Sequence, residues 1–459
     1  MKKIGVTGAS GFIGKALVAA LTARGDYVRA FVRQPDATNL KAPVDVRTLD
    51  LASARIADIA AQLEGLDAVC HLAGETVAGR WTAEKKRKIH DSRELTTRNL
   101  VTAMWECTSR PGVLVCASAS GYYGSRGDEP LGENAPPGDD FLAHVCIDWE
   151  REAQVAEEFG TRVVRLRQGL VLGRDGGALA AMLPPFRFGL GGPLGSGRQW
   201  WPWIHLNDLV ELWLFALDRE DLSGPMNAVA PDPATSERFA QALGHALSRP
   251  SLAPAPAFAL KLALGEFAQS LLASQLLLPA VAQDLEFHWQ HPHLEAALLD
   301  LLDPSGRRTP RTQTFASSQL VDEDLSRVFA FFSDPANLAA LTPQAMRFTI
   351  RTPLPIEMRR GVVIDYSLRV SGWPVHWKTL ITRWDPPHAF EDVALRGPYL
   401  LWRHEHTFET KDAKRVELRD SVEYSLGLAP FSDVALKMVG RRLDEIFAYR
   451  RARVQALLH

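Results

Sequence analysis

The sequence predicts an α/β domain built on a doubly wound parallel sheet, followed by a separate α+β domain. In residues 1–230, short apolar runs alternate with amphipathic helical segments, which is typical of a parallel sheet with helices on both faces. From residue 313 onward, apolar and polar residues alternate as they do in an antiparallel sheet. A chain of 459 residues has room for two or three domains of roughly 150 residues, in agreement with this division.

The composition excludes several classes of partner. Hydrophobic residues make up 46% of the chain and the formal net charge is -2, so no excess of positive charge favours nucleic acid. The longest apolar stretches fall far short of the ~20 residues that span a bilayer. Gly8, Ser10 and Gly11 interrupt any signal-peptide core. We expect a cytoplasmic protein that binds a small molecule, and the sequence leaves its oligomeric state open.

The first domain is predicted to cover residues 1–230. Helical spacing over residues 11–24 follows the first apolar run, and further helical segments separate the later ones. The predicted strands are residues 3–8, 27–32, 44–50, 67–73, 113–118 and 161–168, with 225–229 as one more candidate.

The remaining chain divides in three. Residues 231–302 are rich in Ala, Leu and Pro and predict a helical subdomain on the substrate side, and residues 303–312 predict a polar linker. Residues 313–459 predict the α+β domain, which ends on a long helix over residues 431–459. Its predicted strands are residues 314–321, 347–355, 362–370, 375–384, 402–410 and 414–427, with a helical segment at 322–341.

A glycine-rich turn joins the first predicted strand to the first helix. Gly8 allows the tight turn, Gly11 lets the backbone approach a pyrophosphate, and Gly14 lets the helix pack closely on the sheet. The N-terminus of the helix then faces the phosphates with free N–H groups. This context predicts a Rossmann dinucleotide site, against the alternative of a turn without a ligand. The other turn residues expected at the cofactor are Ser10, Phe12 and Ile13.

The end of the second strand indicates which dinucleotide is bound. NAD enzymes place a carboxylate there, whereas this strand ends on Arg33, whose guanidinium suits a 2′-phosphate. We therefore expect NADP(H), although Arg33 is also compatible with an ordinary surface arginine. Asp50 and Leu51 are expected to border the adenine. Three residues at the end of the fourth strand are expected along the inner edge of the cofactor: Leu72, Ala73 and Gly74.

Four motifs, TGASGFIG, HLAGE, SASGYYG and WPWIHLNDL, resemble those of an extended short-chain dehydrogenase/reductase. More closely, residues 1–300 resemble the atypical "epimerase family" oxidoreductases. The resemblance implies an NADP(H)-dependent oxidoreductase or an epimerase-like enzyme. We also expect Val171 at the cofactor.

The usual catalytic motif of that superfamily is absent. Ordinary members use Ser with a YxxxK pair, in which Lys holds the nicotinamide ribose and lowers the pKa of Tyr. Residues 141–150 read FLAHVCIDWE, with Cys146 about where the Lys would stand. Arg93 occupies the place of the usual Asn, and the atypical subfamily shares both replacements. We expect Arg93 to bind the cofactor or to support a developing oxyanion.

Candidate catalytic residues remain at the end of the fifth strand. Ser118 is expected to serve both cofactor and catalysis, and Tyr122 and Tyr123 lie just beyond it. Packing in the loop is an equal alternative for the two tyrosines, and packing of the helix is the alternative for Cys146. Loss of YxxxK also leaves open a second function, a protein that binds NADP(H) without turnover.

The C-terminal residues 313–459 resemble the START-like SRPBCC ligand-binding superfamily in WRHEHTFE, RVELRDSVEYSLGLAP and RLDEIFAYRRARV. The resemblance implies a helix-grip fold around an apolar ligand. His404 and His406 share one strand face, but no third ligand is apparent, and none of the four cysteines forms a CxxC pair. We therefore predict no metal site.

Overall fold

The computed structural model divides the chain into two compact units, Met1–Thr309 and Pro310–His459. It describes residues 1–34, 40, 43–302, 312–370, 372–412, 415–426 and 432–458, with side chains in the last stretch from residue 438 onward. All but the last residue of the predicted linker 303–312 lie outside these ranges. Within the described chain, none of the helices is both long and apolar enough to cross a bilayer.

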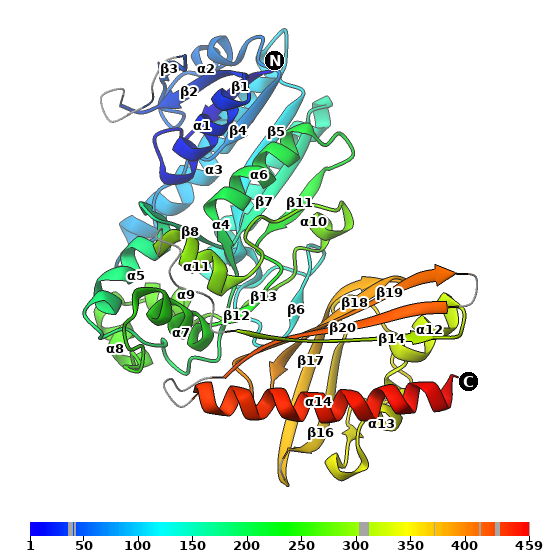
Figure 1. Ribbon diagram of the computed structural model, residues 1–459. Coiled ribbons are helices and arrows are strands. Elements are labelled where there is room, and N and C mark those ends of the chain that lie inside the picture. Colours follow the sequence, from blue (N-terminus) through cyan, green and yellow to red (C-terminus); the bar gives the residue numbers. More distant parts are fainter. Residues whose placement is uncertain are drawn as a thin grey trace. The chain divides into compact units, whose positions relative to one another are not determined.

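The first unit contains the predicted parallel sheet (Figure 1), and this Rossmann-like fold is confirmed. Its seven strands pair in parallel in the order β11-β7-β5-β4-β1-β2-β3. The order reverses on either side of β1, so the crevice beyond the carboxyl ends of β1 and β4 is the expected ligand position. The strands are β1 (Lys3–Thr7), β2 (Tyr27–Val32), β3 (Asp45–Thr48), β4 (Ala68–His71), β5 (Val113–Ala119), β7 (Arg162–Gln168) and β11 (Gly224–Ala228).

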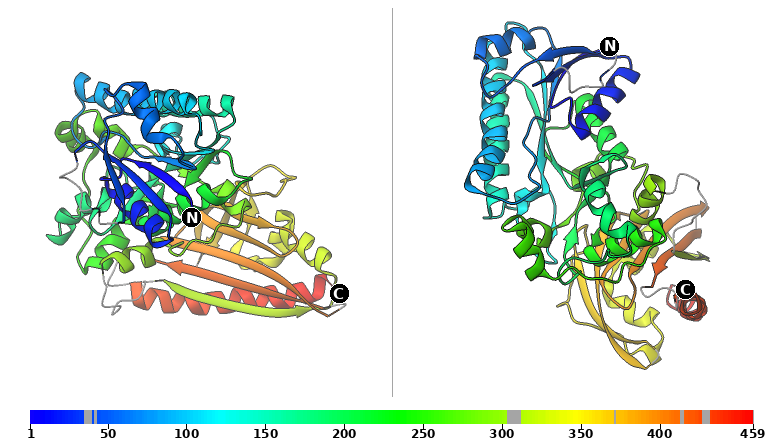
Figure 2. Two further views of the ribbon diagram at one scale, coloured as in Figure 1. Left: turned by 90° about the horizontal axis from the view of Figure 1, so that it is seen from above. Right: turned by 90° about the vertical axis from the view of Figure 1, so that its left-hand side faces the viewer.

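Helices cover both faces of this sheet (Figure 2). Helices α2, α3 and α4 pack together on one face, and α1 packs with α6 on the other. Asp140 caps the N-terminus of α4 by accepting a hydrogen bond from the Ala143 N–H. The helices are α1 (Phe12–Ala23), α2 (Ile56–Leu63), α3 (Ala83–Glu106), α4 (Phe141–Gln154), α5 (Gly177–Arg187) and α6 (Leu206–Asp218).

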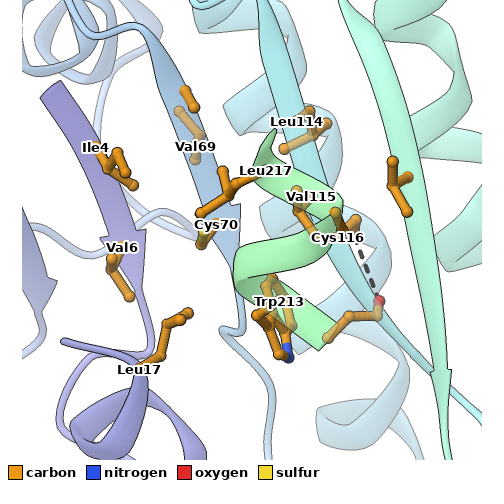
Figure 3. Packing of buried hydrophobic residues seen from close by; sticks show 14 of the residues in the cluster. Ile4, Val6, Leu17, Val69, Cys70, Leu114, Val115, Cys116, Trp213 and Leu217 are labelled. Atoms are coloured by element: carbon orange, nitrogen blue, oxygen red, sulfur yellow. Dashed lines mark hydrogen bonds between the residues drawn. The ribbon is translucent and has the colours of Figure 1, made fainter. Parts of the chain in front are cut away.

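The core explains why the strands read as nearly continuous apolar runs. Central strands bury side chains on both faces, so Ile4 and Val6 of β1 are fully covered. Figure 3 shows Leu17 of α1 and Trp213 of α6 packed over these strands. The apolar pattern of residues 1–230 therefore determines the layers that position the crevice.

The end of the first unit is mainly helical and packs around a second core. Short strand pairs, which the sequence does not predict, tie this part to the loops of the sheet. The strands are β6 (Pro130–Leu131), β8 (Leu170–Gly173), β9 (Trp200–Trp201), β10 (Trp203–His205), β12 (Ala234–Thr235) and β13 (Leu276–Leu277). The helices are α7 (Ser236–Leu247), α8 (Ala257–Leu264), α9 (Phe267–Leu272), α10 (Ala280–Asp284) and α11 (Leu294–Leu302).

The second unit is a seven-stranded antiparallel sheet with a long C-terminal helix. Its order is β14-β20-β19-β18-β17-β16-β15, and Leu443 and Phe447 of the last helix pack on Val422 and Tyr424. The strands are β14 (Gln313–Val321), β15 (Thr349–Ile350), β16 (Val363–Val370), β17 (Trp373–Asp385), β18 (Ala389–Arg396), β19 (Leu401–Asp412) and β20 (Arg415–Ser425). The helices are α12 (Leu325–Ser333), α13 (Leu338–Leu341) and α14 (Ser432–Leu457).

Two strands of this sheet differ from the sequence-based prediction. The segment predicted as a strand at 347–355 pairs only as the short β15, because its prolines cannot donate to a ladder. Strand β18 was missed, because the adjacent acids Glu391 and Asp392 interrupt its apolar alternation. This missed strand contributes an acid to the cavity described below.

Candidate functional site

The glycine-rich turn closes tightly at the carboxyl end of β1. Gly8 has a φ of +64°, and a Cβ there would lie 2.7 Å from the Leu72 carbonyl oxygen. The Gly11 N–H donates to the Gly8 carbonyl at 2.9 Å, and α1 begins at Phe12. The first N–H groups of α1 have no acceptor within the helix. Close backbone packing and a helix N-terminus fit a bound pyrophosphate.

A buried chain of hydrogen bonds holds the loop after β4 against this turn. The Thr97 hydroxyl donates to the Arg93 carbonyl oxygen at 2.6 Å, so the His71 Nε2–H, 3.0 Å away, donates to Thr97. His71 Nδ1 then accepts from the Thr7 hydroxyl at 2.8 Å. The Thr7 oxygen accepts the N–H groups of Leu72 and Ala73 at 3.1 and 3.2 Å.

Burial lowers the pKa of His71 to about 3, so this ring stays neutral. A neutral ring has one donor and one acceptor, as this chain of bonds requires. Sequence reasoning missed the role of Thr7, His71 and Thr97. The signal that could have revealed this role is a histidine at the end of a fully buried strand, because a buried imidazole needs polar partners.

Phe12 and Val171 lie near a second loop. The Phe12 ring lies directly over Gly173 and Gly176, where any Cβ would overlap it. A Cβ on Gly177 would lie 2.7 Å from the Val171 carbonyl oxygen. Phe12 therefore joins the start of α1 to the loop before α5.

The residues predicted around the adenosine differ in exposure. Arg33 is exposed just beyond β2. Asp50 is also exposed, and its carboxylate accepts hydrogen bonds from the Ala52 N–H and the Ser53 hydroxyl. Leu51 is buried in the core of the sheet, and its carbonyl accepts from Asn99. Arg33 is thus a surface cation at the end of β2.

Arg93 lies directly behind the loop after β4. Its Nη1 donates to the carbonyls of Glu75 and Ile89, at 3.0 Å each. Its guanidinium carbon is 5.1 Å from the centre of the Trp149 ring, and a Cβ on Gly74 would lie 3.3 Å from it. The structure therefore brings Arg93 from α3 together with Gly74 and with α4.

Cys146 also lies on α4, and its Sγ is 3.8 Å from the Ala119 carbonyl oxygen. Burial raises the pKa of this thiol to about 12, although the charge of Arg93 acts in the opposite direction. The thiol is therefore protonated at neutral pH, and a thiol is a poor nucleophile. This environment resembles that of a packing cysteine.

Ser118 and Tyr123 belong to a buried polar network centred on Arg167. The Ser118 hydroxyl donates to Glu150 Oε1 at 2.6 Å, and Arg167 binds both carboxylate oxygens of Glu150 at 2.8 Å. Arg167 also donates to the Tyr123 hydroxyl at 2.9 Å, which in turn donates to Asn227 at 2.7 Å. Burial raises the pKa of Tyr123. Both hydroxyls already donate within the protein, which favours a structural role.

Tyr122 differs from its neighbour because its side chain is half-buried. The guanidinium of Arg167 lies 3.5 Å from the centre of its ring. Sequence reasoning missed Glu150 and Arg167. The available signal was an arginine within the apolar strand β7, since a buried charge requires a partner.

The second unit encloses a cavity of about 200 Å³ between the sheet and helices α12, α13 and α14. Its walls are mainly apolar and aromatic. Representative lining residues are Leu338, Met346, Leu368, Trp377, Tyr399 and Ile446. Such a lining suits an apolar small molecule.

One side of this cavity is polar. His404 and His406 are joined there by Asp392 of β18, and each residue offers a ligand atom within 4.8 Å of the other two. Asp392 is thus a candidate third ligand that was not apparent from the sequence. Strand β18 supplies this partner through a cross-strand pairing that periodicity alone does not reveal.

Two family models match the first unit. Residues 4–229 match the NAD dependent epimerase/dehydratase family. Residues 255–301 match a domain of unknown function, DUF1731.

Curated relatives align with about two thirds of the chain. The epimerase family protein SDR39U1 homolog, chloroplastic, of Arabidopsis thaliana is 41% identical over 300 residues, which is 64% of this chain and 85% of the relative. Epimerase family protein YfhF of Bacillus subtilis is 35% identical, over 65% of this chain and 97% of its own.

Solved structures agree with these matches. The human epimerase family protein SDR39U1, solved with NADPH, has a TM-score of 0.59 and 34% identity, over 66% of this chain and 99% of its own. A nucleoside-diphosphate sugar epimerase from Corynebacterium glutamicum has a TM-score of 0.54 and 32% identity, over 66% of this chain and 58% of its own. The glycine-rich turn, the parallel sheet and these relatives lead to one conclusion: the chain belongs to the epimerase family of NAD dependent epimerase/dehydratase proteins.

Proposed function

We propose that the first unit binds NADP(H) and is an oxidoreductase or epimerase-like enzyme that works without YxxxK. One observation carries the proposal. A glycine turn at a helix N-terminus lies beside β2, which is followed by exposed Arg33 rather than by a carboxylate. The human relative solved with NADPH supports the choice of cofactor.

The proposed cofactor contacts come from several segments around the crevice. The turn and α1 would hold the pyrophosphate, and Arg33 the 2′-phosphate. Arg93 would supply the fixed positive charge that the missing Lys normally provides. The full set is Gly8, Ser10, Gly11, Phe12, Ile13, Gly14, Arg33, Asp50, Leu51, Leu72, Ala73, Gly74, Arg93, Ser118 and Val171.

Among the four catalytic candidates, Tyr122 has the strongest claim to proton transfer. Ser118 and Tyr123 use their hydroxyls in the buried network, and Cys146 is a buried thiol. Tyr122 remains partly exposed beside them. A phenol can donate a proton at neutral pH but is a poor base.

A second candidate function is NADP(H) binding without turnover. The hydrogen bonds of Ser118 and Tyr123 favour this function, because the two hydroxyls that were expected to act in catalysis already donate within the protein. Loss of YxxxK agrees with this alternative. Oxidation of bound NADPH, followed at 340 nm over a panel of aldehydes and ketones, separates the two functions. Activity that Tyr122→Phe abolishes would favour the enzyme.

For the second unit we propose a START-like SRPBCC module with a helix-grip fold, in which an apolar ligand occupies the cavity. The antiparallel sheet, the long α14 and the apolar walls support this assignment. We also propose a cytoplasmic location and the division into 1–230, 231–302 and 313–459, joined by the linker 303–312.

The experiment that tests the cofactor proposal compares NADPH with NADH by fluorescence titration of the full chain. We expect NADPH to bind more tightly, and Arg33→Ala to remove most of the difference, since a charged contact to phosphate contributes roughly 1.5–3 kcal/mol. Arg219→Ala is the matched control, because this arginine is also on the first unit and forms an exposed ion pair with nearby Asp221. Equal affinities of the unmodified protein for the two cofactors would contradict the proposal.

A further inference from the structure

The polar side of the cavity in the second unit is assembled from three adjacent strands. Asp392 of β18 pairs directly with His404 of β19, and His406 pairs directly with Asp420 of β20. His404 and His406 are two residues apart, so both face the cavity. Cross-strand register therefore places two imidazoles between two carboxylates.

The two carboxylates contact opposite ring nitrogens. Asp420 Oδ1 lies 3.1 Å from His404 Nε2 and 2.7 Å from His406 Nδ1. Asp392 Oδ1 lies 3.9 Å from the other two nitrogens, His404 Nδ1 and His406 Nε2. These last distances exceed a hydrogen bond. The atoms on the side of Asp392 therefore surround a gap that direct hydrogen bonds do not close.

We propose that Asp392, His404 and His406 bind a divalent first-row transition metal such as zinc, with an open coordination position facing the cavity. Asp392 Oδ1 lies 3.9 Å from one nitrogen of each ring, and the ligand atoms of the three residues all lie within 4.8 Å of one another. Ordinary Zn–N and Zn–O bonds measure about 2.0–2.2 Å, so the three groups must move closer together to complete the site. Two histidines and one carboxylate form a common ligand set of open metal sites.

Asp420 is the positioning residue of this site. A metal-binding imidazole usually gives its second N–H to a carboxylate, which fixes the tautomer and the ring orientation. Asp420 accepts a hydrogen bond from His404 Nε2, and its Oδ1 lies 2.7 Å from His406 Nδ1. The Phe390 ring stacks on His406 with centroids 4.2 Å apart. Arg450 balances Asp420, since its Nη1 lies 3.8 Å from the same carboxylate oxygen.

The charge of the cluster suits a divalent cation. With neutral imidazoles, the two carboxylates and Arg450 sum to one negative charge, which a divalent ion converts to one positive charge. Imidazoles bind metal in the neutral form and carboxylates in the ionised form, so this charge count describes the ligands of an occupied site.

A competing cluster lies in the first unit, where His205, His291 and Asp300 could also hold an ion. There, His205 Nδ1 already accepts the N–H of Asn207, and the two rings stack with centroids 3.8 Å apart. Asp300 is half exposed. That cluster is more exposed than the one at the cavity and makes a useful control.

The test uses the full chain, freed of metal by a chelator and then titrated with Zn²⁺ and, separately, Co²⁺. We expect one Zn²⁺ per chain in calorimetry, and a visible Co²⁺ d–d spectrum without the thiolate charge-transfer band that cysteine ligands would give. The Co²⁺ spectrum is recorded on the unmodified protein, so it tests the site even if a variant fails to fold. Absence of stoichiometric binding, or a thiolate band, would overturn the proposal.

Five single variants and one double variant locate the ion. Asp392→Asn and His406→Gln should each abolish stoichiometric binding, whereas Asp420→Asn should weaken it by about 10–100-fold without removing the Co²⁺ spectrum. The matched control His376→Gln, in the same sheet, and His291→Gln, in the competing cluster, should leave affinity unchanged. Binding that survives His404→Gln combined with His406→Gln, or that disappears in His291→Gln, would overturn the proposal.

Discussion

Two buried polar clusters, one in each unit, differ in how completely their groups are paired. In the first unit, both oxygens of Glu150 accept hydrogen bonds from Arg167, and Ser118 adds another. In the second unit, Asp392 lies 3.9 Å from its nearest imidazole nitrogens and faces a cavity. In the first cluster the carboxylate is fully hydrogen-bonded within the protein, whereas in the second the carboxylate leaves room for a ligand.

The comparison separates structural from functional polar groups. A buried polar network that is fully bonded stiffens its surroundings, and an incomplete one costs free energy unless something else binds there. By this criterion, Ser118 and Tyr123 support the fold near the cofactor crevice. Asp392, His404 and His406 instead form a site prepared for an additional partner.

Removing the carboxylate of the first cluster should cause the largest loss of stability. Glu150→Ala leaves Arg167 buried without its carboxylate, which should lower the free energy of unfolding of the first unit by about 3–5 kcal/mol. Asp392→Ala in the metal-free protein should change the second unit by less than about 1 kcal/mol, because no close ion pair is lost. Urea-dependent hydrogen exchange, read on peptides from each unit, measures both values. Equal losses in the two units would contradict the comparison.

Arg93 should be the next most sensitive position. Arg93→Ala should weaken NADPH binding by roughly 10–150-fold, since a charged hydrogen bond contributes about 1.5–3 kcal/mol. Cys146→Ser should change affinity by less than about tenfold, because a buried neutral thiol provides no charge. Both variants need an unchanged melting temperature before titration. A large effect of Cys146→Ser alone would point to thiol chemistry instead.

His71 should give the first unit a dependence on pH. Its pKa is about 3 in the folded protein and about 6.5 when exposed, so the unfolded state binds the proton more readily between these values. The free energy of unfolding should therefore fall below pH 6.5, by up to about 1.4 kcal/mol per pH unit. His71→Gln should reduce that slope in urea unfolding between pH 6.5 and 5. Identical slopes would show that His71 is not held neutral.

Ser118→Ala should have the smallest effect. If Ser118 only completes the network, the variant loses about 1 kcal/mol of stability and keeps its NADPH affinity. Thermal melting measures the change in stability, and cofactor titration measures the NADPH affinity. A folded variant that has lost NADPH binding would instead restore Ser118 to the cofactor site.

The sequence predicted those features that depend on local pattern. Gly8, Gly11 and Gly14 act within one turn, and the apolar runs of a parallel sheet are visible in the chain itself. The pairing of Glu150 with Arg167 could not be seen, because it joins α4 to β7 through the fold. An arginine within an apolar strand indicates that a partner is needed, but the sequence does not show which acid supplies it.

The second unit shows the same limit. The two-residue spacing of His404 and His406 was visible, but their partner Asp392 lies on a strand whose acidic pair hides its alternation. Only the register of β18 against β19 brings the three side chains together. Sites within one segment are therefore accessible to sequence reasoning, whereas sites between strands require the paired sheet.

Hydrogen exchange of the full chain, measured with NADPH and with Zn²⁺, tests most directly the central claim that each unit has its own site. NADPH should slow exchange in peptides that cover residues 8–14 and 72–74, and Zn²⁺ in peptides that cover residues 390–394 and 402–408. Each ligand should leave the other unit unchanged. Protection by NADPH confined to residues 313–459, or absent from residues 8–14, would contradict the account.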